Sequence, residues 1–455
     1  MVLLRGRMKT CDLRPYSKSK PRLRRFVMTH VNRRTFIGAS LASMSLASLS
    51  QAAVSANEKV NVALVGCGGR GRGLGNWFAK LPESNLVAVC DPDQSRSGQM
   101  AEQAEKAGTK RPRQVEDFRS LLEGDEIDAI VIATPDHWHT PAAIMACQAG
   151  KDVYVEKPCS HNIHEGRQLV NAARKYKRVV QHGTNLRATP VYQKAWKQIQ
   201  DGAIGKVMMV KAINNQRRAL YPPRPDEAVP EGVNYDLWLG PAQKRPFNRN
   251  CFHTSWHWNW DFGTGDIGND GVHQIDIGRW ALNLKAPNAV SCSGAKLGSK
   301  GDAQETPDTM VVTWEYDDLL YVYEQRDFTP YRMQAHRHDN DNIIYGDKGF
   351  MMVDRSGYRI FYKHERGPAF EQKWQDTGAH YQNFLDCVKS RKSQELLAEI
   401  EEGHYSAMLS HLGNIAYRTG RRLVFDPKTE TFPEDKDANQ YLTRTYRDGY
   451  ELPQV

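Results

Sequence analysis

Short apolar segments rich in β-branched residues alternate with segments of helical character from Lys59 onward, and this alternation constrains the fold more than any other feature. The first five apolar segments are 60–65, 86–90, 129–133, 153–155 and 179–181. Each is apolar throughout, which is typical of strands buried on both faces of a parallel sheet. The stretches between them read as the helices that connect parallel strands. The sequence therefore predicts a doubly wound parallel α/β sheet.

The first apolar segment leads into a glycine cluster, Gly66 to Gly71, that fits the pattern G-x-G-x-x-G. The match carries weight because it follows an expected strand and opens an expected helix. Gly66 allows the tight turn, Gly68 lets the backbone approach a pyrophosphate, and Gly71 permits close packing of helix on strand. We therefore expect a Rossmann-type dinucleotide loop; a glycine-rich turn without a ligand is the alternative.

Asp91 follows the second apolar segment, twenty residues past Gly71. A carboxylate there would bind the ribose hydroxyls and repel a 2′-phosphate, so NAD(H) is favoured as the cofactor. Arg70 and Arg96 are close enough in the sequence to keep NADP(H) possible.

The carboxyl ends of parallel strands meet at one edge of the sheet, where ligands of such folds bind. The strand ends and the glycine loop should therefore line one crevice. The expected cofactor contacts are Gly66, Cys67, Gly68, Gly69, Arg70, Gly71, Asp91, Thr134, Pro135, His139, Glu156, Lys157 and Asn185.

A different pattern begins after about Gly183. Apolar and polar residues alternate there, as in antiparallel strands with one buried face; the alternating segments are 207–213, 309–315 and 319–325. Two more apolar segments, 343–345 and 350–353, flank a glycine-containing turn, and helical character returns at 381–390 and 395–419.

These patterns divide the chain into three expected regions. Residues 1–56 form a leader, residues 57–183 a Rossmann NAD-binding domain, and residues 184–455 an α+β domain with a largely antiparallel open sheet. The last region is expected to bind substrate and to mediate oligomerisation.

The leader carries nearly all of the excess positive charge. The net charge of +9 arises because residues 1–34 contribute +10, whereas residues 57–455 sum to −1. A nearly neutral body without a basic run argues against a nucleic-acid partner.

A twin-arginine pattern, Asn32-Arg33-Arg34-Thr35-Phe36-Ile37-Gly38, precedes an uncharged stretch that runs to Leu49, and small residues suitable for cleavage follow. This arrangement predicts export to the periplasm, with translation starting at Met28; a disordered basic tail is the alternative. The apolar stretch is too short for stable membrane insertion.

Lys157 stands at the end of an apolar strand, between Glu156 and Pro158. An isolated surface lysine would carry no function. At this edge of the sheet, however, the side chain would reach the nicotinamide end of a dinucleotide, and partial burial would ease its deprotonation. Lys157 is therefore a candidate for proton exchange with a substrate hydroxyl.

Three segments together resemble the Gfo/Idh/MocA oxidoreductase family: Gly66 to Gly71, Thr134 to His139, and Gly150 to Pro158 with its Glu-Lys-Pro motif. The resemblance implies a second domain whose open sheet often mediates dimers or tetramers. It also implies NAD(P) chemistry at a carbinol carbon of a sugar or cyclitol, with Lys157 as the active-site lysine.

The second motif of that family is an Asp followed four residues later by a His. His273 matches the histidine, but the residue four positions earlier is Asn269. His273 is expected as a second catalytic residue, with a packing role as the alternative. The carboxylate is left open, and Asn269, Asp270 and Asp276 are candidate substrate contacts.

Trp256, Trp258 and Trp260 occupy alternate positions and would project to one side of an extended segment. Their rings would suit the apolar face of a sugar; core packing is the alternative. His253 and His257 lack acidic or Cys partners at ligand spacing, and the seven cysteines beyond residue 56 contain no C-x-x-C pair, so no metal is expected.

Three functions remain open from the sequence. The leading one is an NAD(H)-dependent oxidoreductase that transfers hydride at a carbinol carbon of a sugar-like substrate. The second is an NAD-dependent glycosidase that oxidises a ring hydroxyl transiently, eliminates the aglycone and reduces the ring again. The third is a non-catalytic nucleotide-binding scaffold.

The twin-arginine pattern yields a direct prediction. Replacing Arg33 and Arg34 together by Lys should leave the protein in the cytoplasm, because the export signal depends on the arginine pair. Fractionation with immunodetection checks this result. Undiminished mature protein in the periplasm would contradict a twin-arginine route.

Overall fold

The computed structural model describes residues 59–328, 340–363, 365–372 and 377–455. The leader expected at 1–56, with its arginine pair, lies outside the described residues. No helix of the described part is long and apolar enough to cross a membrane.

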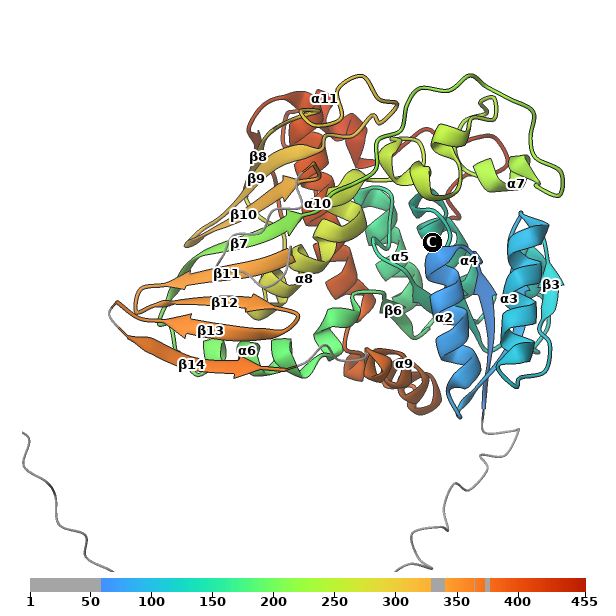
Figure 1. The fold of residues 1–455 in the computed structure, drawn as a ribbon, viewed down its shortest axis with the longest axis horizontal. Coiled ribbons are helices and arrows are strands. Elements are labelled where there is room, and N and C mark those ends of the chain that lie inside the picture. Colours follow the sequence, from blue (N-terminus) through green and yellow to red (C-terminus); the bar gives the residue numbers. More distant parts are fainter. Residues whose placement is uncertain (1–58, 329–339, 364, 373–376) are drawn as a thin grey trace, which may run out of the picture. The chain divides into compact units, whose positions relative to one another are not determined.

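The first sheet has six parallel strands in the order β3-β2-β1-β4-β5-β6, the order of a dinucleotide-binding Rossmann sheet. It lies on the right of Figure 1. The predicted doubly wound parallel sheet is confirmed. In sheet order the strands are β3 (Arg113–Val115), β2 (Ser84–Cys90), β1 (Val60–Val65), β4 (Ala129–Ile132), β5 (Asp152–Val155) and β6 (Val180–His182).

Helices cover both faces of this sheet because neighbouring residues of its apolar strands point in opposite directions. One core contains α2 (Gly69–Lys80), α3 (Gln94–Lys106) and α9 (Gly378–Ser390). The other contains α4 (Asp136–Gln148) and α5 (Ile163–Lys175). The chain thus returns to the first sheet late in the sequence, through α9.

The second sheet has nine strands, and all of its pairs are antiparallel except β7 with β10. The predicted largely antiparallel sheet is confirmed. In sheet order the strands are β14 (Arg366–Glu371), β13 (Gly357–Phe361), β12 (Phe350–Asp354), β11 (Asn340–Gly346), β7 (Val207–Asn215), β10 (Leu319–Arg326), β9 (Thr309–Tyr316), β8 (Ala289–Ala295) and β15 (Leu423–Val424).

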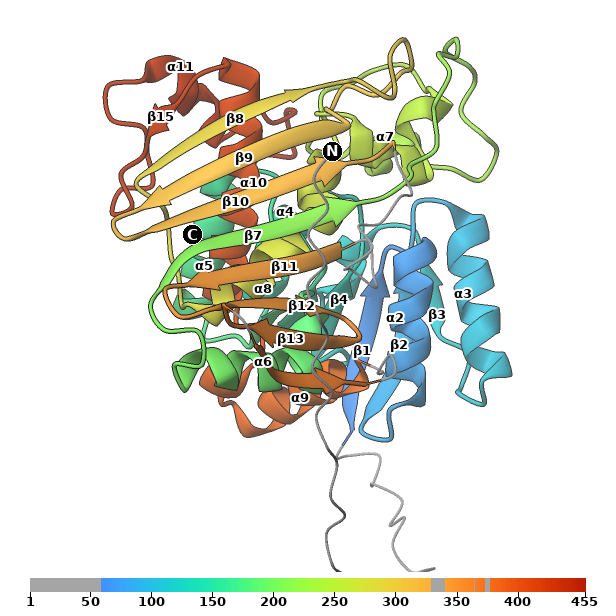
Figure 2. The same cartoon turned by 60° about the vertical axis from the view of Figure 1, so that its left-hand side comes forward.

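One face of the second sheet packs against α6 (Pro190–Gln200), α8 (Val272–Ala281) and α10 (Ile400–Thr419). Figure 2 shows the strands in front of these helices. No described element covers the opposite face, where Val311 and Leu320 are 45% and 46% exposed.

The helix expected at 395–419 begins only at Ile400. The residues before it are extended because they pair with the edge of the first sheet: the His182 N–H donates to Ala398 O at 2.8 Å, and Glu399 bridges Gln181. Tertiary pairing thus overrides local helix propensity.

The irregular segment between β7 and α8 contains the short helix α7 (Tyr235–Leu239) and two 3₁₀ turns, η4 (Arg249–Cys251) and η5 (His253–Trp258). A π-helical turn, η6 (Ile267–Gly271), then runs directly into α8. The remaining short elements are η2 (Phe118–Leu121), η3 (Asn185–Ala188), η7 (Ser393–Glu395), α11 (Lys436–Asn439) and η8 (Gln440–Leu442).

Candidate functional site

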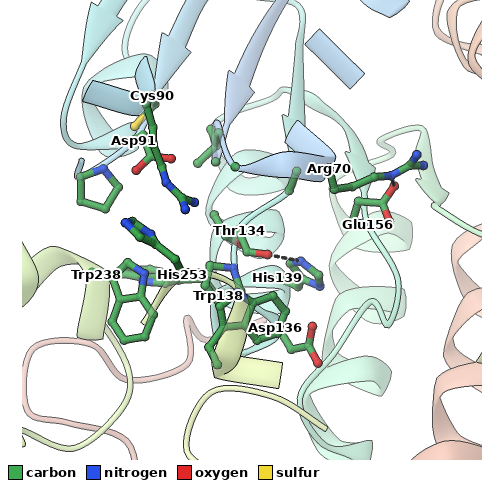
Figure 3. A pocket seen from close by; sticks show the side chains of 18 of the residues that line it. Arg70, Cys90, Asp91, Thr134, Asp136, Trp138, His139, Glu156, Trp238 and His253 are labelled. Atoms are coloured by element: carbon green, nitrogen blue, oxygen red, sulfur yellow. Dashed lines mark hydrogen bonds and ion pairs between the residues drawn. The ribbon is translucent and has the colours of Figure 1, made fainter. Parts of the chain in front are cut away.

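A pocket lies beyond the carboxyl ends of β1, β2, β4 and β5 (Figure 3). Most of the expected cofactor contacts line it, whereas Cys67, Gly71 and Asn185 do not. The lining residues among those expected are Gly66, Gly68, Gly69, Arg70, Asp91, Thr134, Pro135, His139, Glu156 and Lys157.

The glycine loop has the geometry that a bound dinucleotide requires. Gly66 has a φ of +92°, and a Cβ there would lie 2.5 Å from the carbonyl oxygen of Ala133. A Cβ on Gly71 would lie 1.8 Å from Gly66 O, so this glycine serves packing and does not line the pocket. A Cβ on Gly69 would meet only open space.

The first helix of the sheet, α2, begins at this loop without a side-chain cap. Its first N–H groups are therefore available to phosphate oxygens, as in other dinucleotide sites. The loop and the helix start fit a pyrophosphate.

Asp91 fixes the loop from the end of β2. Its two carboxylate oxygens accept the N–H groups of Cys67 at 2.7 Å and Asp93 at 2.9 Å. The buried Cys67 thus contributes a backbone link, and its thiol points to Cys90 O. Burial raises the pKa of Asp91, although the two N–H donors oppose this effect.

Arg70 and Glu156 form an ion pair at the wall of the pocket, with Nε 2.6 Å from Oε1 (Figure 3). Burial alone would raise the pKa of Glu156, but the charges of Arg70 and Lys157 lower it below its usual value. Arg70 also donates to Tyr381 on α9, at 3.2 Å, and Asn185 donates to the same hydroxyl at 3.3 Å. Asn185 therefore supports this wall from behind.

The His139 ring is held by two backbone carbonyls, those of Thr134 and Pro158, at 2.9 and 2.6 Å. Figure 3 shows the first of these contacts. Burial lowers the pKa of His139. Its role is to brace the two strand ends.

Lys157 ends β5 and reaches the π-helical turn η6 of the second domain. Its Nζ donates to the backbone oxygen of Asn269, and it lies 3.3 Å from Asn269 Oδ1. Lys157, the predicted active-site lysine, therefore contacts Asn269, the residue that stands where the family motif has an aspartate.

His273 is the second residue of α8, four positions after Asn269, and is 9% exposed. Burial, followed by the positive charge of Lys157, lowers the pKa of His273 well below its usual value. The imidazole is therefore neutral at pH 7.

A carboxylate network lies behind Asn269. Its Nδ2 donates to Asp266 Oδ1 at 3.0 Å, and Arg218 approaches the same carboxylate at 2.5 Å. Asp270 lies 3.7 Å from the Arg218 guanidinium. Asp270, a candidate substrate contact, does not line the pocket, and neither does Asp266.

The expectation that Asp276 contacts substrate is wrong. Its side chain is fully buried and accepts two hydrogen bonds from Arg187, at 2.8 and 2.7 Å, and one from Ser406 at 2.6 Å. One helical turn past His273, this residue faces the protein core.

The three tryptophans do not form one platform, because their segment is a 3₁₀ turn and not extended. Trp256 lines the pocket. Trp258 is buried, with Arg218 over its ring at 5.5 Å, and Trp260 packs with Arg418 at 5.1 Å. Only Trp256 is placed to touch a ligand in the pocket.

Asp136 lines the pocket but was not among the expected site residues. It is buried, accepts the Thr264 hydroxyl at 2.7 Å, and burial raises its pKa to about 7. Its position directly after the strand-end pair Thr134-Pro135 was the available signal.

Side chains of the irregular segment form the other side of the pocket. Two backbone hydrogen bonds anchor this segment at the end of β2: Gln94 N to Gly232 O at 3.0 Å, and Asn234 N to Pro92 O at 2.8 Å. We call residues 232–257 the clamp. Its pocket-lining residues are Leu237, Trp238, His253, Thr254, Trp256 and His257.

The clamp is also tied to the start of α4. The Trp138 indole donates to Leu237 O at 3.1 Å, and His253 Nε2 lies 3.2 Å from Asp93 Oδ2. Figure 3 shows His253 and Trp238 facing Asp91 and Trp138 across the pocket. Sequence reasoning could not place these residues, because their segment has no periodic pattern.

No group of three or more His, Cys, Asp or Glu side chains within the described ranges is arranged to hold a metal ion.

Two family models match the chain: an oxidoreductase-family NAD-binding Rossmann fold at residues 60–184, and the C-terminal α/β domain of the same family at residues 222–452.

Curated relatives match parts of the chain. Inositol 2-dehydrogenase 2 of Saccharopolyspora erythraea is 27% identical over 54% of this chain and 61% of its own length. A glycosyl hydrolase family 109 protein of the same organism is 31% identical over 34% of this chain and 35% of its own length. The chain thus spans less than two thirds of each of these relatives.

The solved structure of levoglucosan dehydrogenase with NADH and levoglucosan has a TM-score of 0.63 and 17% identity, covering 80% of this chain and 99% of that chain. This likeness shows a shared fold. Together with the two family models, which cover both sheets and the pocket, it leads to one conclusion. The chain belongs to the Gfo/Idh/MocA oxidoreductase family and carries that family's NAD-binding Rossmann domain.

Proposed function

We propose that this protein is an NAD(H)-dependent oxidoreductase that transfers hydride at a carbinol carbon of a sugar, glycoside or cyclitol. The observation that carries the proposal is the Lys157 amine, held by Asn269 at the strand end beside the glycine loop. The names of the relatives, an inositol dehydrogenase and a levoglucosan dehydrogenase, support a polyol or sugar substrate.

Oxidation of a carbinol removes hydride from carbon and a proton from oxygen. Bound NAD⁺ supplies the hydride acceptor. The Lys157 amine takes the hydroxyl proton, and in the reverse direction its ammonium returns that proton. His273, neutral because of its low pKa, hydrogen-bonds the same oxygen and orients it.

A transient-oxidation glycosidase is the second candidate function. Two observations favour it: side chains of the clamp line one side of the cofactor pocket, and a family 109 glycosyl hydrolase matches part of the chain. A cofactor that stays bound and is reduced and reoxidised in each cycle needs no free NAD. Lys157 and His273 would then serve proton transfer beside the ring carbonyl.

Export by the twin-arginine route belongs to the same proposal, because that route carries folded proteins and so can deliver an enzyme already loaded with its cofactor. We also infer a homodimer or homotetramer. The uncovered sheet face supports this, because Val311 and Leu320 are exposed on it.

Lys157→Ala should lower turnover about 10²–10⁴-fold, because positioned proton transfer contributes that much, while NAD binding survives. His273→Ala should also lower turnover, and the double variant should lose less than the two penalties combined if the pair acts as one unit. Steady-state assays on free sugars and on glycosides measure both effects. They also separate the functions: NADH accumulation marks a dehydrogenase, and aglycone release without NADH marks a glycosidase.

Lys175→Ala is the matched control, since this lysine is exposed on α5 of the same domain. It should retain wild-type turnover. Near wild-type turnover of Lys157→Ala on a genuine substrate would refute the assignment. Absence of both reactions with a broad substrate panel would point to the scaffold.

Cofactor choice should depend on Asp91, whose carboxylate would repel a 2′-phosphate. Calorimetric titration of cofactor-free protein should show tighter binding of NAD(H) than of NADP(H). Asp91→Ser should reduce the difference in affinity between NAD(H) and NADP(H). It should also weaken the binding of both cofactors, because the Cys67 N–H loses its hydrogen-bond acceptor. Asp128→Ser is the control: this exposed carboxylate also accepts a backbone N–H, from Asn61 at 2.7 Å, and does not line the pocket. Equal or tighter NADP(H) binding by the unaltered protein would overturn the assignment.

The clamp should slow cofactor release. Mass spectrometry of purified, denatured protein should find NAD, and exchange with isotope-labelled NAD should be slow. His253→Ala removes the contact with Asp93 and should speed exchange about tenfold, the value of roughly one hydrogen bond to a charged group. His164→Ala, an exposed site on α5, should leave the exchange rate unchanged. Rapid exchange in the unaltered protein would contradict a retained cofactor.

A further inference from the structure

The residue four positions before His273 is a neutral amide where the family motif has a carboxylate. Asn269 sits in the π-helical turn η6, and both its backbone oxygen and its side-chain oxygen face the Lys157 Nζ. Turns of this kind occur frequently at functional sites. One residue therefore supplies two acceptors to the lysine amine.

The orientation of the Asn269 amide follows from its other partner. A carboxylate can only accept, so the Asn269 Nδ2 must face Asp266, and the Oδ1 must face Lys157. Asp266 is itself fixed, because Arg218 approaches at 2.5 Å and the Asn214 amide donates at 2.9 Å. Burial alone would raise the pKa of Asp266, but Arg218 and hydrogen bonds from Asp327 and Asn269 lower it. Burial and the Asp266 charge raise the pKa of Asp327, so Asp327 carries the proton of this pair and Asp266 the charge.

The charge of Lys157 acts on several ionisable groups around it. Glu156 is held by Arg70, and Asp136 accepts from Thr264. The carboxylates and imidazoles whose pKa values respond to the Lys157 charge are Asp136, Glu156, Asp270, His139, His257 and His273. The direct acceptors at Nζ are those of Asn269.

We propose that Asn269 is a positioning residue that holds the Lys157 amine with two neutral acceptors. The charged carboxylate of Asp266 contacts the Asn269 amide on its other side. An ammonium has three N–H groups, so two bonds to Asn269 leave the third for the substrate oxygen. A carboxylate in direct contact would favour the protonated amine. The neutral amide places no negative charge in direct contact with the amine. The inference rests on the proposed role of Lys157.

The sharpest test exchanges the two side chains, Asp266→Asn together with Asn269→Asp. The pair keeps one carboxylate and one amide in contact, so that packing and the number of charges are preserved. The charge now touches Lys157, and the pH midpoint of kcat/KM for oxidation should rise by about 1–3 units, the range for an opposite charge within ~4–6 Å.

A second readout does not depend on turnover. Acetic anhydride labels only neutral amines, and peptide mass spectrometry gives the rate at Lys157 as a function of pH. The exchange variant should move this curve upward by the same amount. Lys175, which is exposed on α5 of the same domain, is the internal control and should keep its curve.

Asn269→Ala covers the case in which the exchange variant does not fold. It removes one acceptor from Lys157, and kcat should fall about 10- to 100-fold from misplacement of the amine, while the acetylation curve stays or moves to lower pH. An unmoved curve in the exchange variant, or an upward shift in Asn269→Ala, would overturn the inference. If Lys157→Ala retains turnover, the proposed function fails instead, whatever the acetylation curves show.

Discussion

The buried ion pair between Arg187 and Asp276 determines where the two halves of the site meet. Arg187 follows the last strand of the first sheet, in η3, and Asp276 lies on α8; their side chains are 3% and 1% exposed. Ser406 adds a contact from α10. Because α8 continues directly from η6, this pair sets the position of His273 and Asn269 relative to Lys157. Removing one partner of a buried ion pair typically costs ~3–5 kcal/mol, and here Glu402, which lies 3.5 Å from Arg187, would offset part of that cost if Asp276 were removed.

Much of the fold could be predicted because its strands carry strong local signals. Five strands of the first sheet follow from apolar segments, whereas β3 was not predicted because it is short and carries the polar residues Arg113 and Gln114. The central strands of the second sheet follow from alternation. The short strands β13, β14 and β15 were not predicted either: β14 contains Gly367 and Pro368, which are depleted in strands, and β15 has two residues. The return of α9 to the first sheet was equally hidden, because amphipathic periodicity shows that a helix has a buried face and not what covers that face.

The candidate site was predictable where chemistry and strand position coincide. The glycine loop, Asp91 and Lys157 all follow apolar strands, and strand ends of a parallel sheet converge. The prediction that Asp276 contacts substrate failed because its spacing from His273 does not reveal that its side chain points into the core. The position of the clamp could not be predicted for a physical reason. Its segment is anchored to the Rossmann domain by backbone hydrogen bonds, and such bonds leave no periodic pattern in the sequence.

The proposed chemistry and the proposed location place the same demand on the cofactor. A periplasmic enzyme has no ready supply of free NAD, so each hydride removed from one substrate carbon must be returned to a carbon before the next cycle. Such a cycle needs a group that acts first as a base and then as an acid while it keeps the same hydrogen-bond partners. Lys157 suits this task, since Asn269 offers neutral acceptors to the amine and to the ammonium alike. The clamp would suit it as well, because its side chains line the pocket opposite Asp91. In the proposed cycle, retention of the cofactor and the neutrality of Asn269 would be two parts of one requirement, that oxidation and reduction alternate at a single site.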